Sequence, residues 1–109
     1  MTTLKPRHYH VLLALADEPR HGLAIARQVQ QLSEGHVRLW PATLYGTLDD
    51  LLDRGWIAEL DEHPAEESDK KRFYQLTRAG RQVLASETER LSGLVKVARA
   101  RLRRAGEIS

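Results

Sequence analysis

The stretch WPATLYGTLDDLLDRGWI, residues 40–57, is the most informative part of the sequence because it specifies one amphipathic helix with both ends marked. Its leucines recur at the spacing i, i+4, i+7 and i+8, which places them on one side of a helix. Pro41 suits the first helical turn, where the missing N–H costs nothing. Gly55 suits the position just past the end, where a left-handed backbone is needed. The apolar side consists of Leu44, Leu48, Leu51 and Leu52.

The side of this helix opposite the leucines carries no charge in its N-terminal half. Small residues let the backbone approach another surface closely, and Thr and Tyr can hydrogen-bond to phosphates or base edges. This pattern favours a DNA-recognition helix. A solvent-exposed face with a few small residues is the alternative, and the helix alone does not decide between them. The whole side opposite the leucines consists of Ala42, Thr43, Gly46, Asp49, Asp50 and Asp53, with Tyr45 and Thr47 on its flanks.

Composition excludes several kinds of protein. The 109 residues suffice for one domain with a modest core, and the net charge of +2 is compatible with nucleic acid but weak support for it. The absence of cysteine excludes disulfides and thiolate metal sites. The five histidines show no metal-ligand spacing and no catalytic motif occurs, so we expect no metal, no cofactor and no enzyme. No apolar run suits a membrane span or a signal peptide, so a cytoplasmic location is expected.

Two further helices precede the quoted stretch. Apolar residues at helical spacing predict a first helix over residues 6–16, ended by the breaker run at 17–20. His21 and Gly22 open a second helix, which Gly35 closes. Three short helices, the last two joined by a tight connection, are the skeleton of a helix-turn-helix.

The pattern that follows the quoted helix predicts a β-hairpin. Residues 56–60 and 72–77 suit two short strands, and the polar connection between them shows no apolar periodicity. A three-helix unit followed by a hairpin is the winged form of the helix-turn-helix, with the hairpin as its wing. The expected fold is therefore mainly α with a small β-hairpin, and residues 1–77 form a winged helix-turn-helix domain.

Residues 78–109 predict a long C-terminal dimerisation helix with a basic tail. The helix would run for about 27 residues, or ~40 Å, which is longer than a compact domain of this size can cover. Its apolar residues form a heptad-like stripe, so we expect the same helix of a second subunit to bury them. A helix folded back along its own domain is the alternative. The expected homodimer interface contains Leu84, Leu91, Val95, Ala98 and Leu102, with Tyr9 and Leu13 from the first helix.

Specific motifs occur in three stretches of the chain: LLALADEPRHGLAI (12–25), PATLYGTLDDLLDRGWI (41–57) and RFYQLTRAGRQVL (72–84). In this order they resemble the PadR family of transcriptional regulators, in its smaller subtype with a single C-terminal helix. The resemblance implies a homodimer that binds double-stranded DNA, usually as a repressor. Two-fold symmetry then calls for a palindromic operator. The resemblance also implies a small aromatic effector between the winged domains and the dimerisation helices, here near Tyr9, Leu13 and Leu91.

The DNA contacts are expected at the start of the quoted helix and in the wing. Thr43, Tyr45 and Thr47 would contact the groove, and Gly46 would let the backbone approach it. The wing connection departs from the family because residues 61–69 hold five acids and no Lys or Arg, which puts its contribution in doubt. The alternative function is a winged-helix module for protein contacts without DNA. Phosphate contacts are expected from Arg38, Lys70, Lys71 and Arg72.

Overall fold

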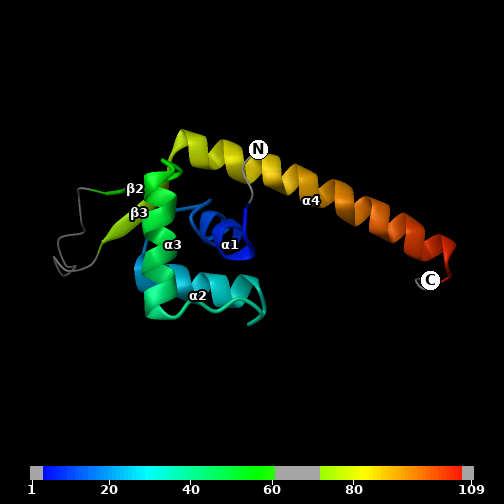
Figure 1. Ribbon diagram of the computed structural model, residues 1–109, viewed down its shortest axis with the longest axis horizontal. Helices are drawn as coiled ribbons and strands as arrows, with labels where there is room; N and C mark the ends of the chain where they lie inside the picture. Colours follow the sequence, from blue (N-terminus) through cyan, green and yellow to red (C-terminus); the bar gives the residue numbers. More distant parts are fainter. Residues whose placement is uncertain (1–3, 61–71, 107–109) are drawn as a thin grey trace.

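The computed structural model describes residues 4–60 and 72–106 (Figure 1). Three helices pack around one apolar core, a small sheet lies beside them, and a long last helix passes over α1 and extends beyond the other elements (Figure 1). The mainly helical winged fold predicted from the sequence is thereby confirmed. The helices are α1 (Pro6–Ala14), α2 (Gly22–Leu32), α3 (Pro41–Asp53) and α4 (Arg78–Arg104), and the strands are β1 (Arg20–His21), β2 (Ile57–Glu59) and β3 (Phe73–Leu76).

The described sheet has three strands rather than the two of the predicted hairpin. Its order is β1-β3-β2 and both pairings are antiparallel, with Arg20 opposite Tyr74 and Ala58 opposite Gln75. β1 comes from the end of the run predicted as a breaker. Two residues are too few to show the alternation of a strand. The Nε–H of Arg20 donates to the carbonyl of Ala14 at 2.9 Å, which holds β1 beside the end of α1.

Most helix ends lie where the sequence predicts them. The ring Nδ1 of His21 accepts a hydrogen bond from the backbone N–H of Ala24 at 3.3 Å and so caps the start of α2. α3 begins at Pro41, and Gly55 just beyond its end has a φ of 76°. Two helices end earlier than predicted: α1 ends at Ala14, two residues before the predicted end, and α2 ends at Leu32, three residues before Gly35.

The core lies between the leucine side of α3 and the facing sides of α1 and α2. Leu44, Leu48 and Leu51 are buried as predicted, whereas Leu52 at the edge of this side is only partly covered. Non-directional apolar burial therefore holds the three helices together. The other buried apolar residues are Val11, Leu12, Ala14, Leu15, Ile25, Val29, Trp56, Ile57, Tyr74 and Leu84.

The start of α4 is joined to the turn that follows α3. Thr77 caps α4, because its hydroxyl oxygen accepts from the N–H of Gly80 at 3.0 Å. The same hydroxyl donates to the carbonyl of Gly55 at 2.6 Å, and the N–H of Thr77 donates to the carbonyl of Trp56 at 3.1 Å. Gly80 packs so closely that a Cβ there would lie 1.9 Å from the Trp56 carbonyl oxygen. Only glycine allows this approach.

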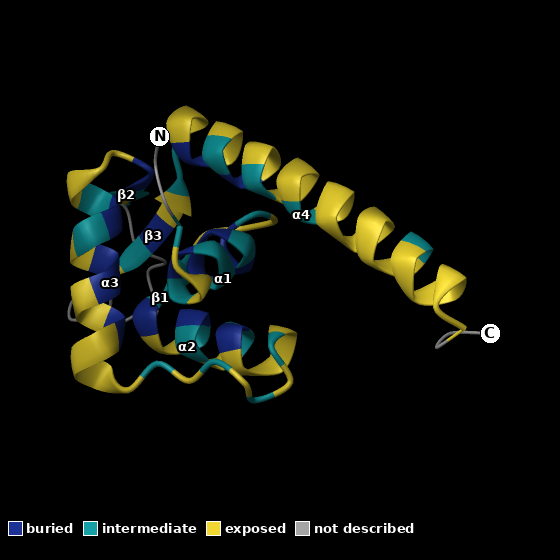
Figure 2. Cartoon of the chain, turned by 45° about the vertical axis from the view of Figure 1, so that its right-hand side comes forward, coloured by how far each residue is buried: buried dark blue, intermediate teal, exposed yellow. Residues whose placement is uncertain are grey.

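α4 has a half that packs on its own domain and a half that does not (Figure 2). In the first half Leu84 is buried in the core, and the Tyr9 hydroxyl lies 2.8 Å from the Thr88 hydroxyl oxygen. Leu84 was expected in the dimer interface, so its place in the core of its own chain is a correction. The second half exposes Leu94, Val95, Val97, Ala98 and Leu102. No described helix is long and apolar enough to span a membrane.

Candidate nucleic-acid interface

The start of α3 presents an exposed surface without charge. Thr43 and Gly46 are exposed, and Tyr45 is 52% exposed with its ring against the backbone of Gly22. A Cβ placed on Gly46 would meet no atom within 4 Å. A flat surface can therefore approach this part of the helix closely, as expected from the sequence.

The N–H groups at the start of α3 add a second feature of this surface. Trp40 occupies the N-cap position, and its side chain makes no capping hydrogen bond. The first N–H groups of a helix have no partner inside the helix, and together with the helix dipole they favour an anion. The start of α3 is therefore chemically suited to a phosphate.

Thr47 lies elsewhere than expected. It is 3% exposed, and its hydroxyl donates to the carbonyl of Thr43 within the same helix at 2.7 Å. One position along a helix turns the side chain by about 100°, which carries Thr47 from the Gly46 side toward the core. Its side chain is not accessible to DNA in this conformation, so we leave it out of the interface.

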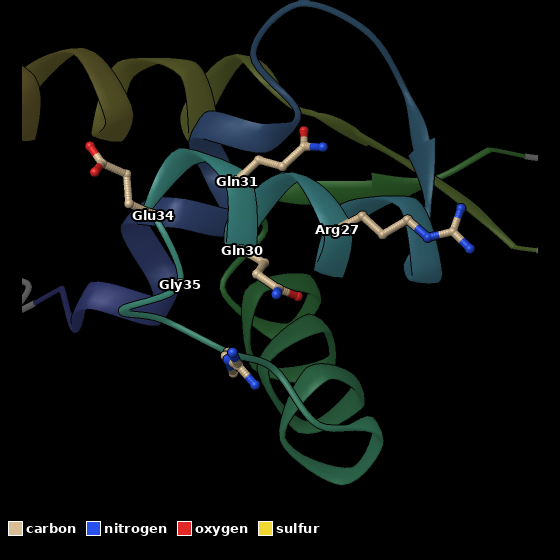
Figure 3. Close-up of a pocket in the computed structure, with 6 residues that line it drawn as sticks. Arg27, Gln30, Gln31, Glu34 and Gly35 are labelled. Carbon is tan, nitrogen blue, oxygen red and sulfur yellow. The ribbon is translucent and has the colours of Figure 1, made fainter.

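Two arginines stand beside the start of α3. Arg38 is exposed in the connection before α3, and together with Arg27 and Gln30 of α2 it lines an open hollow (Figure 3). Figure 3 shows Arg27 projecting on one side of the labelled residues and Glu34 on the other. Arg27 was not among the phosphate contacts predicted from the sequence. Its exposed position on α2 becomes meaningful only beside Arg38.

Large apolar side chains lie exposed next to these arginines. Trp40 is 66% and Leu23 58% exposed, and both line a second hollow that shares Arg27 and Arg38. Exposed apolar groups gathered beside charged ones typically mark a contact surface. Neither residue was among the DNA contacts predicted from the sequence.

The wing contributes one described cation. Arg72 is exposed, and its Nε lies 3.4 Å from the carboxylate of Glu59. A surface ion pair of this kind contributes little free energy, so a phosphate can replace Glu59 as its partner. Arg72 also lies near Tyr45 and Asp49 around a small hollow between α3 and the sheet. Lys70, Lys71 and the acidic connection lie outside the described residues.

Negative charge lies toward the other end of α3. Asp49 and Asp53 are exposed, whereas Asp50 lies 3.2 Å from Arg54 and 2.8 Å from the buried ring of His8. Arg54 beside Asp50 holds the pKa of that carboxyl below its usual value. The charges along α3 therefore repel a polyanion from its second half and favour one at its start.

A separate hollow lies between the start of α1 and α4. Its volume is about 240 Å³, and Tyr9 and Leu91 line it, as expected for an effector site, whereas Leu13 does not. Arg90 reaches it paired with Glu87 at 2.7 Å. Among the described residues no group of three His, Asp or Glu side chains could hold a metal ion. The remaining lining residues are Leu4, Lys5, Pro6 and His10.

Comparison with known proteins places this geometry in a family. The model of the transcriptional regulator PadR-like family matches residues 11–86. An uncharacterized 37.1 kDa protein in transposon TN4556 of Streptomyces fradiae is 44% identical over 88 residues, and the match covers 78% of this chain but only 24% of that protein. The chain thus spans about a quarter of its curated relative.

Solved structures share the fold. A PadR family transcription regulator from Clostridium difficile R20291 superposes with a TM-score of 0.70 at 21% identity, covering 87% of this chain and 96% of that one. PadR of Bacillus subtilis, solved in complex with operator DNA, gives 0.66 at 21% identity and covers 77% of this chain and 48% of its own.

Proposed function

The chain belongs to the PadR-like family of transcriptional regulators, and we propose that it binds a palindromic operator as a homodimer and acts as a repressor. The observation that carries the proposal is the start of α3, which is exposed, uncharged and uncapped and lies beside Arg27 and Arg38. The structure of Bacillus subtilis PadR in complex with operator DNA supports the proposal by likeness of fold.

In the proposed complex the start of α3 enters the major groove of one half-site. Thr43 and Tyr45 supply hydrogen bonds to bases or phosphates, and Gly46 keeps the backbone close. Trp40 and Leu23 are suited to the methyl groups of thymines and to sugars, because apolar side chains contact these parts of DNA. The ionic contribution comes from Arg27, Arg38 and Arg72, with Lys70 and Lys71 of the wing.

The proposed dimer forms through the second half of α4. Its apolar side chains are exposed in the single chain, and a helix of 27 residues offers them to a second copy in the two-fold arrangement that a palindrome requires. Residues 1–77 then act as the DNA-binding unit and residues 78–109 as the dimerisation unit.

The hollow between α1 and α4 is the site we propose for a small aromatic effector. Tyr9 and Leu91 offer apolar contacts, and Lys5 and His10 offer polar groups at the rim. Its 240 Å³ is less than the roughly 300–1,000 Å³ of most ligand sites, so a second subunit would complete it. A thermal-shift screen of planar aromatic compounds should give at least one stabilising compound, and a flat screen would argue for regulation without an effector.

DNA binding is tested by changing Gly46, whose surroundings are open. An operator is first selected from random double-stranded DNA, and its affinity is measured by fluorescence anisotropy. Gly46→Leu should weaken operator binding by about fivefold or more, since one lost base contact typically costs ~1–3 kcal/mol. Gly93→Leu is the matched control, because Gly93 is also helical and open but lies in α4. Equal affinity of the two variants would contradict the role of α3.

Salt dependence separates DNA binding from the alternative of a protein-contact module. The logarithm of affinity should fall with the logarithm of salt concentration with a slope of about −0.9 per phosphate neutralised. Arg38→Ala should make this slope shallower by about one per subunit and weaken all sequences alike. If the folded protein selects no DNA and shows no salt-dependent binding to it, the protein-contact module becomes the better account.

The dimer is tested on side chains that do not pack on their own domain. Val95→Asp combined with Leu102→Asp should give a monomer in analytical ultracentrifugation, with weakened operator binding. Ser86→Asp adds a charge to the exposed opposite side of α4 and should remain a dimer. We avoid Leu91 because it also lines the hollow against α1. A wild-type protein that sediments as a monomer at micromolar concentration would refute the dimer.

A further inference from the structure

Two neighbouring residues of α1 contact two different helices. His8 lies 2.8 Å from Asp50 of α3, and Tyr9 lies 2.8 Å from Thr88 of α4. Consecutive side chains on a helix point about 100° apart, so one short helix can contact both of its neighbours in this way. We call His8 and Tyr9 the α1 contact pair. It lies where α1 is packed between the recognition helix and the proposed dimerisation helix (Figure 1).

The contact of His8 with α3 is electrostatic and buried on the His8 side. His8 is 2% exposed, and its Nδ1 accepts a hydrogen bond from the backbone N–H of Lys5 at 3.2 Å. The single proton of the neutral ring therefore lies on Nε2, the nitrogen that faces the carboxylate of Asp50. The geometry between the Nε2–H of His8 and the Asp50 carboxylate falls short of a directed hydrogen bond. The electrostatic attraction between these two groups therefore offsets the cost of burying Nε2.

The contact of Tyr9 with α4 is a directed hydrogen bond. The Thr88 hydroxyl donates to the carbonyl of Leu84 at 2.8 Å, which uses its only proton. The Tyr9 hydroxyl must then donate to the Thr88 oxygen. Leu84 is itself buried in the core one turn before Thr88, so the bond lies where α4 already packs on its own domain.

Polar contacts join α3 and the turn that follows it to other elements near Gly55 and at Asp50. At its end, the carbonyl of Gly55 accepts from the Thr77 hydroxyl at the start of α4. Within its last turns, Asp50 faces His8. A helix fixed at one place can still pivot about it, whereas two places fix its direction. Close packing of Leu44, Leu48 and Leu51 in the core also constrains α3, and the two polar contacts add directed constraints to it.

We propose that His8 is a positioning residue, which through the α1 contact pair fixes the direction of α3 relative to α4 and thereby the half-site spacing that the dimer accepts. This rests on the proposed function. A pivot of about 10° about Gly55 would move the start of α3, roughly 21 Å away at 1.5 Å per residue, by about 3.7 Å. That distance is about the 3.4 Å rise of one base pair.

The test uses the selected operator and versions of it with one base pair removed from or added to the segment between the half-sites. The wild-type dimer should prefer one spacing by about tenfold or more. His8→Leu should bind its best spacing within a few-fold of wild type, but its preference should shrink to about threefold or less. His8→Gln should restore the preference, because its amide nitrogen can occupy the place of Nε2.

Control variants separate position from general destabilisation. His36→Leu is the matched control, because the exposed His36 ring bonds the Ser33 carbonyl at 2.9 Å and does not contact α3. It should keep the wild-type preference. Should His8→Leu fail to fold, Asp50→Ala removes the same contact from a side chain that is 40% exposed, and it should relax the preference likewise.

Two outcomes would overturn the inference while leaving operator binding in place. One is a His8→Leu or Asp50→Ala protein that loses affinity equally at every spacing, which is what a purely structural role predicts. The other is a wild-type dimer that binds all spacings equally. A wild-type protein that is folded but binds no selected operator would refute the proposed function itself, and the inference with it.

Discussion

Replacing Gly80 by alanine should lower the free energy of unfolding, because Gly80 packs directly against the backbone of Trp56. A Cβ at this position would lie 1.9 Å from the carbonyl oxygen of Trp56, and real Cβ contacts are essentially never below 3.0 Å. The two backbones must therefore separate by about 1.1 Å, the difference between these distances. The carbonyl that moves also accepts the N–H of Thr77, so its hydrogen bond at the start of α4 is strained or lost.

The expected cost follows from three contributions of known size. Forced overpacking costs ~1–3 kcal/mol, a lost hydrogen bond costs about 1 kcal/mol, and alanine returns about 1 kcal/mol through its better helix propensity. We expect Gly80→Ala to lower the free energy of unfolding by roughly 2 kcal/mol. Gly93 lies in the same helix with no atom near its Cβ position, so Gly93→Ala should raise it by up to about 1 kcal/mol.

The assay is urea unfolding followed by far-UV circular dichroism, with all proteins at one concentration because a dimer unfolds in a concentration-dependent way. The midpoint should fall for Gly80→Ala and rise for Gly93→Ala, at similar slope. The same substitution in one helix thus has opposite signs. If both variants shift in the same direction by the same amount, helix propensity alone explains them and the close contact of Gly80 with Trp56 is refuted.

Three more predictions concern single side chains. Burial lowers the pKa of His8 below its ordinary 6.5, so on acidification the unfolded chain takes up a proton that the folded chain does not. The free energy of unfolding should therefore fall as the pH drops below about 6.5. In urea titrations at several pH values, His8→Gln should lack this contribution to the pH dependence. Thr47→Val should leave operator affinity within about threefold in anisotropy measurements, since the Thr47 hydroxyl bonds only its own helix; a larger loss would mean that this hydroxyl reaches DNA. Trp40→Ala should lower operator affinity by about tenfold with an unchanged unfolding midpoint. Replacing thymine by uracil in the operator removes the methyl group that Trp40 is proposed to contact, so it should lower the affinity of wild type more than that of this variant.

Local sequence patterns determined the helices and most of their ends. The leucine spacing and the flanking Pro41 and Gly55 predicted α3 with both ends, and His21 predicted the start of α2. These predictions succeed because a helix forms from contacts between residues three and four apart and from caps at its ends. The motifs around α3 and β3 likewise indicated the family that the match over residues 11–86 shows.

What covers each side of those helices follows from the packing of distant elements. The apolar stripe of α4 is one pattern in the sequence, yet Leu84 is buried in its own domain while Val95 and Leu102 are exposed. Thr47 is buried although its neighbour Gly46 is open, and His8 faces Asp50 across 42 residues of chain. Periodicity reports which residues share a face. Which partner lies against that face depends on how distant elements pack, and local spacing carries no information about that.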